Sequence, residues 1–352
     1  MQTVTVNASK KYDVRIGTGF IDNIGEEIAP FMSGKKVMVV SDDKVFGIYG
    51  DRVVKSLEES GYTVFTSVFQ NGEDSKNITN YEKLVEALFE AQLSRKDLVI
   101  AVGGGVVTDL AGFAAATYQR GIGLVMVPTT LLAAVDASVG GKNGINLLHG
   151  KNQIGTFYQP GLVLCDIETL HSLPREEYIN GCAEIIKYAM IENEGLFELI
   201  RDNEIMDKYE EIITRCVTIK RDYVEADEFD VGKRMMLNFG HTIGHAVEAC
   251  SGYTIPHGRA VAIGMAAITK AAVVNGYCTE DTRMQLDELL EQYNLLDELK
   301  YKAEDLMQYV KVDKKNSSGM LRIVIPKAIG SCWIKEIYKE ECLKWIVLGG
   351  AR

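Results

Sequence analysis

The sequence lacks any long uninterrupted apolar run, because glycines break its longest apolar stretches. Such short stretches do not cross a bilayer, and no signal-peptide pattern precedes Val4, so we expect neither a membrane function nor export. The seven cysteines are odd in number, scattered and never in CxxC spacing. This pattern argues against a disulfide framework and against a thiolate zinc site, and it favours a reducing cytoplasm.

Basic charge is also scarce, since 38 Lys and Arg residues stand against 49 Asp and Glu residues, a net charge of −11. Nucleic acid and anionic lipid are therefore disfavoured as partners, and any anionic ligand needs a local basic cluster. The chain is 47% hydrophobic and 25% charged, which is typical of a soluble globular protein and excludes disordered, collagen-like and coiled-coil classes. A length of 352 residues indicates two domains.

The two halves of the chain differ in their hydrophobic pattern. The first half alternates apolar runs with amphipathic segments, which predicts βα units around a mostly parallel sheet. From Pro174 onward, helical periodicity predominates. We place the boundary in the loop around His171 to Arg175, which gives an α/β domain at 1–172 and a mainly α-helical domain at 173–352. The expected strands are 36–41, 62–68, 98–102 and 124–127, and the expected helices are 50–60, 78–92, 110–117, 179–191, 204–226, 235–251 and 258–275.

The third expected strand runs directly into Gly103-Gly104-Gly105 and then into a helix. Glycines let a backbone approach an anion, and a helix N-terminus presents free N–H groups to it. The letters GGGVVTD are not the GxGxxG dinucleotide fingerprint, so a tight βα turn is an equally good interpretation of this segment alone. A second Gly- and Thr-rich segment, Val127 to Asn146, contains Asp136 and Lys142 and favours a ligand site.

Several cations of this acidic chain lie beside glycines or other small residues, where a side chain can reach a ligand. Taken singly, each is best interpreted as a solvated surface charge. Taken together, they indicate an anion site. These cations are Arg120, Lys142, Lys151 and Lys187.

Histidine is rare, with five in the chain, yet three of them lie close together in sequence. His241 and His245 are four residues apart on an expected helix and share a face, and His257 begins the next helix. Histidines alone at this spacing are more often structural, but two of them with one carboxylate would suit a zinc ion. Glycines flank these histidines, and glycine in a helix needs a close-approach reason. Spacing leaves the carboxylate open among Glu184, Glu248 and Asp136.

Six segments, taken as a set and in this order, resemble the 3-dehydroquinate synthase family: GGGVVTDLAGFAAATYQRGI, VPTTLLAAVDASVGGKNGIN, GKNQIGTFYQP, GCAEIIKYAMI, LNFGHTIGHAVE and IPHG. The resemblance implies an α/β N-terminal domain that binds NAD and a mainly α-helical C-terminal domain that binds Zn²⁺ or Co²⁺. It implies Glu184, His241 and His257 as the metal ligands, with His245 contacting substrate or relaying a proton instead.

The resemblance also implies the other contact residues. Those implied for NAD are Asn71, Gly72, Glu73, Asp74, Ser75, Lys76, Gly105, Val106, Val107, Thr108, Asp109, Thr129, Thr130, Lys142, Lys151, Thr169, Leu170, His171 and Ser172. Those implied for substrate are Arg120, Asp136, Lys142, Asn152, Lys187, Lys220, Arg234, Asn238, His245 and Lys314. Three features depart from the family pattern, namely Asn143 in place of Thr, Leu148-His149 in place of a Pro-containing turn, and Asp230 in place of Glu.

The reaction implied is that of the shikimate pathway, in which 3-deoxy-D-arabino-heptulosonate 7-phosphate becomes 3-dehydroquinate and phosphate. It proceeds by transient oxidation with NAD, β-elimination of phosphate, re-reduction and intramolecular aldol closure. In the family Arg120 reaches the phosphate site of the neighbouring subunit, so a homodimer is implied.

Three alternatives remain at this stage. A sibling sugar-phosphate cyclase would act on a substrate without a carboxylate, but such a substrate would leave Lys220, Arg234 and Asn238 unpaired at a cost. A metal-dependent polyol dehydrogenase would catalyse net oxidation and would not need so many cations. A non-catalytic NAD-sensing protein would not need the metal residues. Asp42, just after the first long strand, is open between holding ribose hydroxyls and forming a turn.

Overall fold

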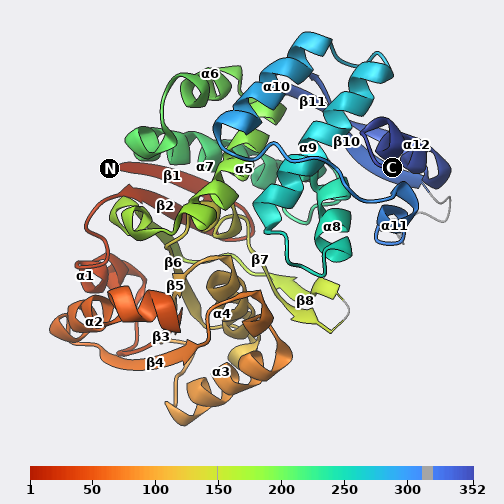
Figure 1. The fold of residues 1–352 in the computed structure, drawn as a ribbon. Helices are drawn as coiled ribbons and strands as arrows, with labels where there is room; N and C mark the ends of the chain where they lie inside the picture. The colour runs from red at the N-terminus through yellow and green to blue at the C-terminus, as the bar shows by residue number, and fades with distance from the viewer. Residues whose placement is uncertain (149, 311–319) are drawn as a thin grey trace. The chain divides into compact units, whose positions relative to one another are not determined.

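The structure is a computed structural model that describes residues 1–148, 150–310 and 320–352, and the chain forms two compact units (Figure 1). The first unit comprises Met1–Pro174 and Tyr209–Phe229, and the second comprises Arg175–Lys208 and Asp230–Arg352. The first break therefore lies close to the domain boundary that we expect after Ser172. Tyr209–Phe229 differs from that expectation, because it packs with the first unit although it lies beyond the boundary.

A seven-stranded sheet forms the centre of the first unit, in the order β1-β2-β9-β6-β5-β3-β4. Neighbouring strands are parallel except β1 and β2, which are antiparallel. The four strands expected from the sequence are β3 to β6. Strands β1, β2 and β9 were not expected, although β9 contains an apolar run, Leu162–Cys165, as long as the expected run 124–127. The bounds are β1 Gln2–Asn7, β2 Lys11–Gly17, β3 Lys36–Asp42, β4 Thr63–Phe69, β5 Leu98–Gly103, β6 Gly123–Pro128 and β9 Leu162–Asp166.

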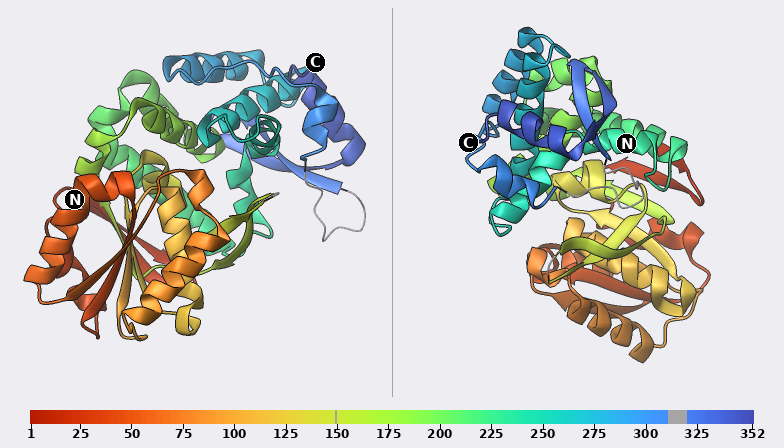
Figure 2. Two further views of the ribbon diagram at one scale, coloured as in Figure 1. Left: turned by 60° about the horizontal axis from the view of Figure 1, so that its bottom comes forward. Right: turned by 90° about the vertical axis from the view of Figure 1, so that its right-hand side faces the viewer.

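Helices cover both faces of this sheet, as the left view of Figure 2 shows. Helices α1 (Ile24–Ile28) and α2 (Asp43–Glu59) join one core with alternate residues of the strands, such as Val37 and Val39 of β3. The residues between them, such as Met38, are also buried, as expected for a parallel sheet covered on both sides. The remaining helices of the unit are α3 Ile78–Glu90, α4 Gly105–Thr117 and α7 Tyr209–Ala226, with short helices η1 Ala29–Phe31, η2 Glu73–Ser75, η3 Tyr118–Arg120, η4 Ala133–Ala137 and η5 Ile167–Ser172.

The sheet has a topological switch point at the carboxyl ends of β3 and β5. The chain leaves β3 toward β4 on one side and returns to β5 on the other side. Open α/β sheets bind ligands at such points. The glycine turn Gly103-Gly104-Gly105 follows β5 there, so the strand, glycine turn and helix expected from the sequence are present. A small antiparallel pair, β7 (Lys142–Leu147) and β8 (Gly150–Phe157), packs against α4.

The second unit is mostly helical, as expected, and α8 packs along α9, which also contacts α5. Its strands β10 and β11 form an antiparallel pair that the sequence analysis did not predict. The helices are α5 Arg175–Glu192, α6 Glu194–Asp202, α8 His241–Cys250, α9 His257–Val274, α10 Glu280–Gln292, α11 Ala303–Met307 and α12 Lys339–Leu348, with short helices η6 Ile205–Lys208 and η7 Lys233–Asn238 and strands β10 Met320–Ala328 and β11 Ser331–Tyr338.

The helix expected over 235–251 is interrupted in the structure. Its first part is the 3₁₀ helix η7, and α8 begins only at His241. Gly240 separates the two in a left-handed conformation with φ of 78°, which glycine adopts without strain. The break places His241 at the start of α8 rather than in the middle of a longer helix.

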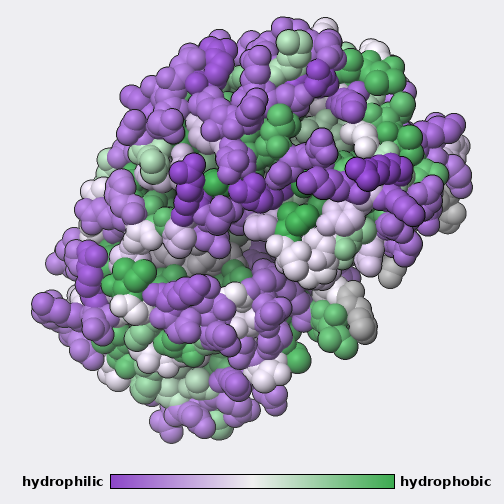
Figure 3. All heavy atoms as spheres, in the orientation of Figure 1, coloured by the Kyte–Doolittle hydropathy of each residue, from purple (hydrophilic) through white to green (hydrophobic). Residues whose placement is uncertain are grey.

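Hydrophilic residues cover much of the face drawn in Figure 3, with hydrophobic residues interspersed among them. Among the described residues, no helix combines the length and the apolar character that crossing a bilayer requires.

Candidate functional site

Three helices of the second unit bring together a carboxylate and two imidazoles. Helix α5 carries Glu184, α8 begins with His241 and α9 begins with His257. Glu184 Oε1 lies 3.6 Å from His241 Nε2 and 3.2 Å from His257 Nε2. All three potential ligand atoms lie within 4.8 Å of one another. Glu184 is almost fully buried, so the cluster has one deeply placed charge with two nitrogens facing it.

Glycines allow these helices to approach so closely. A Cβ on Gly244 of α8 would lie 3.0 Å from Val261 Cα of α9, and a Cβ on Gly258 would lie 2.1 Å from the Asn180 carbonyl oxygen of α5. A Cβ on Gly264 would lie 2.0 Å from the Gly240 carbonyl oxygen. A Cβ on Gly240 would lie 2.7 Å from the Val261 carbonyl oxygen. The close-approach reason expected for the glycines that flank the histidines, Gly240, Gly244 and Gly258, is therefore present.

Both histidines turn Nε2 toward Glu184 because their other nitrogen has a partner. His241 Nδ1 lies 3.1 Å from the Phe239 carbonyl oxygen, and His257 Nδ1 lies 3.3 Å from Glu248 Oε2. Burial lowers the pKa of His241 to about 3, so this ring is neutral and can offer a lone pair. Burial alone would lower the pKa of His257 too, but hydrogen bonds to Glu184 and Glu248 outweigh burial and raise the pKa to about 10.

One carboxylate and two imidazoles are the donor set of zinc sites that keep positions open, so these residues fit a divalent ion. Of the three carboxylates that spacing left open, Glu184 faces both Nε2 atoms. Glu248 faces the opposite nitrogen of His257, and Asp136 belongs to the first unit. His245 is exposed, and its ring centre lies 5.2 Å from that of His241 and 5.9 Å from that of His257.

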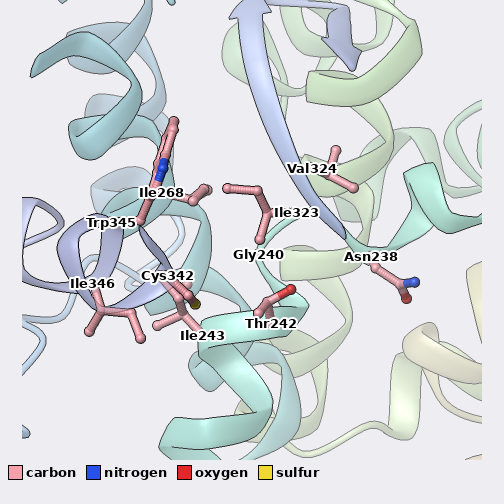
Figure 4. A pocket seen from close by; sticks show the side chains of 11 residues that line it. Asn238, Gly240, Thr242, Ile243, Ile268, Ile323, Val324, Cys342, Trp345 and Ile346 are labelled. Carbon is pink, nitrogen blue, oxygen red and sulfur yellow. The ribbon is translucent and has the colours of Figure 1, made fainter. Parts of the chain in front are cut away.

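A small cavity in the second unit is lined on one side by Thr242 and Ile243 of α8. Figure 4 shows apolar side chains of α9, β10 and α12 around it, including Ile268, Ile323 and Trp345, with Asn238 at one end. Its accessible volume is about 10 Å³, which is room for a single water molecule at most. This cavity is a packing gap and does not accommodate a substrate.

In the first unit, the residues expected to bind NAD gather at one edge of the sheet. Asn71–Lys76 follow β4, Gly105–Asp109 follow β5, Thr129 and Thr130 follow β6, and Thr169–Ser172 follow β9. These strands are parallel, so their carboxyl ends share that edge. We call it the cofactor edge. Lys142 begins β7 and Lys151 lies in β8.

Polar contacts tie the loops of the cofactor edge to one another. Lys76 forms an ion pair with Asp109 at the start of α4. Asn146 donates its backbone N–H to the Lys76 carbonyl oxygen over 2.8 Å and its side-chain amide to Glu73 Oε1 over 2.7 Å. Sequence reasoning assigned no role to Asn146, and its only signal is its place at the end of the segment that contains Lys142.

The N-terminus of α4 suits an anion. Gly104 is its N-cap residue and provides no side-chain cap, so the first N–H groups of the helix face the cofactor edge. A Cβ on Gly104 would lie 2.9 Å from the Thr130 methyl carbon, so glycine is needed for close packing. Asp42, by contrast, accepts hydrogen bonds from the Lys44 and Val45 backbone N–H groups, each at 3.0 Å, and so caps α2. The structure favours the turn interpretation for Asp42.

The residues expected to contact substrate are distributed over both units. In the first unit, Lys220 of α7 forms an ion pair with Asp136, while Asn152 is exposed on β8. In the second, Lys187 pairs with the metal candidate Glu184 one helical turn away. Two further members, Arg234 and Asn238, lie in η7, and Arg234 is only 2% exposed. Lys314 lies outside the described residues.

Arg120 is separated from the cofactor edge of its own unit. It lies in η3, just before the amino end of β6, whereas Thr129 follows the carboxyl end of that strand. A six-residue strand spans roughly 20 Å, so Arg120 and Thr129 lie at opposite edges of the sheet. Asn143, one of the departures from the family pattern, is buried and donates to the carbonyl oxygens of Gly141 and Tyr158. Asn143 therefore braces the chain around β7.

Sequence comparisons identify the family. Residues 66–180 match the 3-dehydroquinate synthase N-terminal family, and residues 181–316 match the 3-dehydroquinate synthase C-terminal family. The 3-dehydroquinate synthase of Lactococcus lactis subsp. cremoris is 43% identical over 343 residues, which cover 95% of this chain and 96% of that protein. That of Clostridium acetobutylicum is 40% identical, with the same coverage of 95% and 96%. The chain belongs to the 3-dehydroquinate synthase family.

Solved structures agree with the fold expected of a 3-dehydroquinate synthase family member. A 2-deoxy-scyllo-inosose synthase in complex with carbaglucose-6-phosphate, NAD⁺ and Co²⁺ aligns with a TM-score of 0.88 at 25% identity, covering 98% of this chain and 99% of that one. A 2-epi-5-epi-valiolone synthase from Streptomyces hygroscopicus aligns with a TM-score of 0.87 at 24% identity, covering 98% of both chains. A butanol dehydrogenase from Thermotoga maritima, at 16% identity with 96% of both chains covered, has a TM-score of 0.66 and shares the fold alone.

Proposed function

We propose that this chain is a 3-dehydroquinate synthase, which converts 3-deoxy-D-arabino-heptulosonate 7-phosphate to 3-dehydroquinate and phosphate with NAD and a zinc or cobalt ion. The observation that carries the proposal is the Glu184, His241 and His257 cluster in a chain of this family. The related 2-deoxy-scyllo-inosose synthase, solved with NAD⁺ and Co²⁺, supports the same cofactors here. All seven cysteines are free thiols, which supports a cytoplasmic enzyme.

Glu184, His241 and His257 would hold the divalent ion. When bound, the ion polarises a substrate hydroxyl oxygen, and NAD takes up a hydride and later returns it. The protein holds His241 neutral through burial, which keeps its Nε2 lone pair available. His245, exposed beside this cluster, would hydrogen-bond substrate or move a proton.

The cofactor edge would bind NAD. The uncapped start of α4 would face the pyrophosphate, where helix N–H groups stabilise negative charge. Lys76 and Asp109 would fix the neighbouring loops through their ion pair, and Thr169–Ser172 would line the same edge after β9. Tyr49 donates to the Thr169 carbonyl oxygen over 3.2 Å, which holds this last loop in place.

The cations indicate an anionic substrate, and this favours the proposal over the sibling cyclases. Arg234 is a buried cation, and the planar guanidinium of an arginine matches the geometry of a carboxylate. The substrate carboxylate would meet Arg234 and Asn238, and Lys220 and Lys314 would contribute further contacts. Identities of about 40% to 3-dehydroquinate synthases, against 25% for the inosose synthase, support the same choice.

Arg120 would act on the substrate phosphate of a neighbouring subunit, so the enzyme would be a homodimer. This assignment follows from the family resemblance. It is supported by the position of Arg120 at the amino edge of β6, where the side chain is remote from the cofactor edge of its own chain.

A substrate panel tests the proposal. Purified protein with NAD and zinc is incubated with the heptulosonate phosphate and, separately, with two sugar phosphates that lack a carboxylate, glucose 6-phosphate and sedoheptulose 7-phosphate. We expect phosphate release and 3-dehydroquinate from the first substrate only. Turnover of a carboxylate-free sugar instead, or steady accumulation of NADH, would contradict the proposal.

A further inference from the structure

Glu248 is a buried acid that no ligand set implied by the family includes. It lies on α8, seven residues and therefore about two turns after His241, so both side chains point to the same side of the helix. Glu248 is only 2% exposed. A carboxylate is costly to bury unless it has a partner that offsets the lost hydration, and Glu248 lies within hydrogen-bond distance of His257.

His257 stands between two carboxylates that face different nitrogens of its ring. Nε2 lies 3.2 Å from Glu184 Oε1, and Nδ1 lies 3.3 Å from Glu248 Oε2. A neutral imidazole carries one hydrogen, and a hydrogen on Nδ1 that is donated to a carboxylate leaves the lone pair on Nε2. Nε2 is the nitrogen that a cation beside Glu184 needs.

Contacts of α9 with α5 and α8 hold the His257 ring and Glu248 in this arrangement. Helix α9 begins at His257 and its second residue, Gly258, donates its backbone N–H to the Asn180 side chain. Helix α8 is held against α9 through Gly244. Glu248 therefore approaches His257 from a rigid neighbour, and the ring cannot rotate without losing that hydrogen bond.

We propose that Glu248 is a positioning residue that holds the His257 ring and its Nδ1 hydrogen so that the Nε2 lone pair faces the ion site at Glu184. The inference rests on the proposed metal site but not on the identity of the substrate. Glu248 acts on the ion through His257, as carboxylate partners of metal-ligating histidines do.

A rival arrangement uses the same atoms. His245, Glu248 and His257 also form a group that could hold an ion. A second ion there would require Nδ1 of His257 to lose its hydrogen, so that the ring would offer one nitrogen to each ion. The hydrogen-bond distance between Nδ1 and Glu248 favours one ion with a positioned ligand, and metal stoichiometry separates the two arrangements.

The test measures zinc binding without NAD or substrate, so its outcome is independent of the reaction catalysed. Zinc affinity is obtained by competition with a chromophoric chelator for the wild type, Glu248→Ala, Glu248→Gln and a control, Leu286→Ala, which removes a buried side chain of α10 in the same unit. We expect Glu248→Ala to weaken zinc binding by roughly 10- to 100-fold. Glu248→Gln keeps an acceptor oxygen and should retain most of the affinity, and Leu286→Ala should lower stability alone.

A spectroscopic readout accompanies the affinities. In the zinc-loaded wild type labelled with ¹⁵N-histidine, the Nδ1–H of His257 should give a protected resonance that disappears in Glu248→Ala, and one zinc should bind per chain. If Glu248→Ala keeps wild-type affinity, or if the wild type shows no such resonance, Glu248 does not position His257.

Two zinc ions per wild-type chain, one of them lost in Glu248→Ala, would establish the rival arrangement. If Glu248→Ala fails to fold, the wild-type resonance and the Glu248→Gln affinity still decide. A wild type that binds no zinc would contradict the metal site itself.

Discussion

His241 and His257 present the same nitrogen to Glu184 but differ in the direction in which their surroundings shift their pKa values. Burial keeps His241 neutral, with a pKa of about 3, whereas two carboxylates keep His257 protonated, with a pKa of about 10. A divalent ion would replace the Nε2 proton of His257. Removing this one ring therefore removes a proposed ligand together with the ring that faces both carboxylates, whereas the ion pair between Lys187 and Glu184 remains.

We predict that His257→Ala loses metal and turnover together. Zinc affinity should fall by more than roughly 100-fold, because removing a metal ligand weakens binding more than removing a residue that hydrogen-bonds to a ligand. Zinc content after gel filtration, with turnover measured on the same sample, checks this. His245→Ala is the matched control from the same cluster and should keep its zinc while losing activity. Stoichiometric zinc in His257→Ala would refute the ligand assignment.

Asp97 illustrates a charge that serves the fold. Its two oxygens accept from the Lys35, Lys36 and Ser94 backbone N–H groups and from the Ser94 hydroxyl, at 2.7 to 3.2 Å. Burial raises the pKa of Asp97, but these four hydrogen bonds outweigh burial and hold the pKa below its usual value. A lowered folded-state pKa contributes stability above the unfolded-state pKa, and this contribution is lost as pH falls through the folded-state pKa.

Asp97→Asn should therefore lower the free energy of unfolding at neutral pH by roughly 1–3 kcal/mol, and the difference from wild type should shrink below about pH 4. Urea unfolding followed by circular dichroism at several pH values measures both. Asp51→Asn, an exposed change on α2, is the control and should have little effect. A deficit that does not depend on pH would show that the Asp97 charge is not the cause.

Residue identities in the metal cluster could be proposed from the sequence, but the carboxylate could not be chosen from spacing. Glu184 lies on α5, far from His241 along the chain, and only the packing of α5 against α9 brings it near. Helical spacing from His241 is equally compatible with Glu248 as the carboxylate ligand. In the structure, however, Glu248 faces Nδ1 of His257, whereas Nε2 is the nitrogen that lies beside Glu184 and His241. The role of Asn146 was hidden for the same reason, because its partners Glu73 and Lys76 come from another loop.

At the scale of elements, the contact between α8 and α9 positions His241 and His257, the two histidines proposed to bind the metal. A Cβ on Gly264 would meet the Gly240 carbonyl oxygen at 2.0 Å, and that atom is backbone, which cannot swing away. Gly240 and His241 are adjacent, so any separation of the two helices moves a ligand.

We predict that Gly264→Ala lowers the free energy of unfolding by roughly 1–3 kcal/mol through overpacking and weakens zinc binding. The matched control is Gly47→Ala, because a Cβ on Gly47 of α2 meets no atom within 4 Å, and it should be neutral or stabilising by up to about 1 kcal/mol. Thermal unfolding and zinc competition on both variants check this. Unchanged zinc affinity in Gly264→Ala would show that the helix contact does not set the ligand geometry.

Elements were predictable where one physical signal dominated. The apolar runs of β3, β5 and β6 follow from burial on both faces of a parallel sheet, and helical periodicity located α5 and α9. The edge strand β4 has no buried residue. Periodicity could not show that Gly240 divides the expected 235–251 helix, since a left-handed glycine leaves the apolar spacing intact. Periodicity also could not show which unit the apolar face of α7 packs against. In the structure, α7 packs on β1 and β2 of the first unit.

At the scale of the whole molecule, the proposed dimer makes a prediction that one chain alone would not. If Arg120 completes the site of the partner, a mixed dimer of Arg120→Ala and His257→Ala chains has one site with both defects and one intact site. Equal co-expression of the two inactive variants should then restore about a quarter of wild-type activity through random pairing. Purification through two different affinity tags isolates the mixed dimer, and a mixed dimer without activity would contradict the partner role of Arg120.

The acidic composition also acquires a meaning at this scale. A net charge of −11 disfavours polyanionic partners, while the proposed substrate is a small doubly anionic sugar acid that needs only local cations. Lys220 and Arg234, both buried, are such cations, and net charge does not report on them.

In the proposed reaction, the chain uses NAD as a catalyst and expels phosphate in the same turnover. The most direct measurement incubates zinc-loaded protein with excess 3-deoxy-D-arabino-heptulosonate 7-phosphate and a substoichiometric amount of NAD, and quantifies phosphate, 3-dehydroquinate and NADH together. We predict equimolar phosphate and 3-dehydroquinate, each far exceeding the NAD supplied, with no net NADH. Product limited to the amount of NAD, with matching NADH, would contradict this catalytic use of NAD and indicate a dehydrogenase.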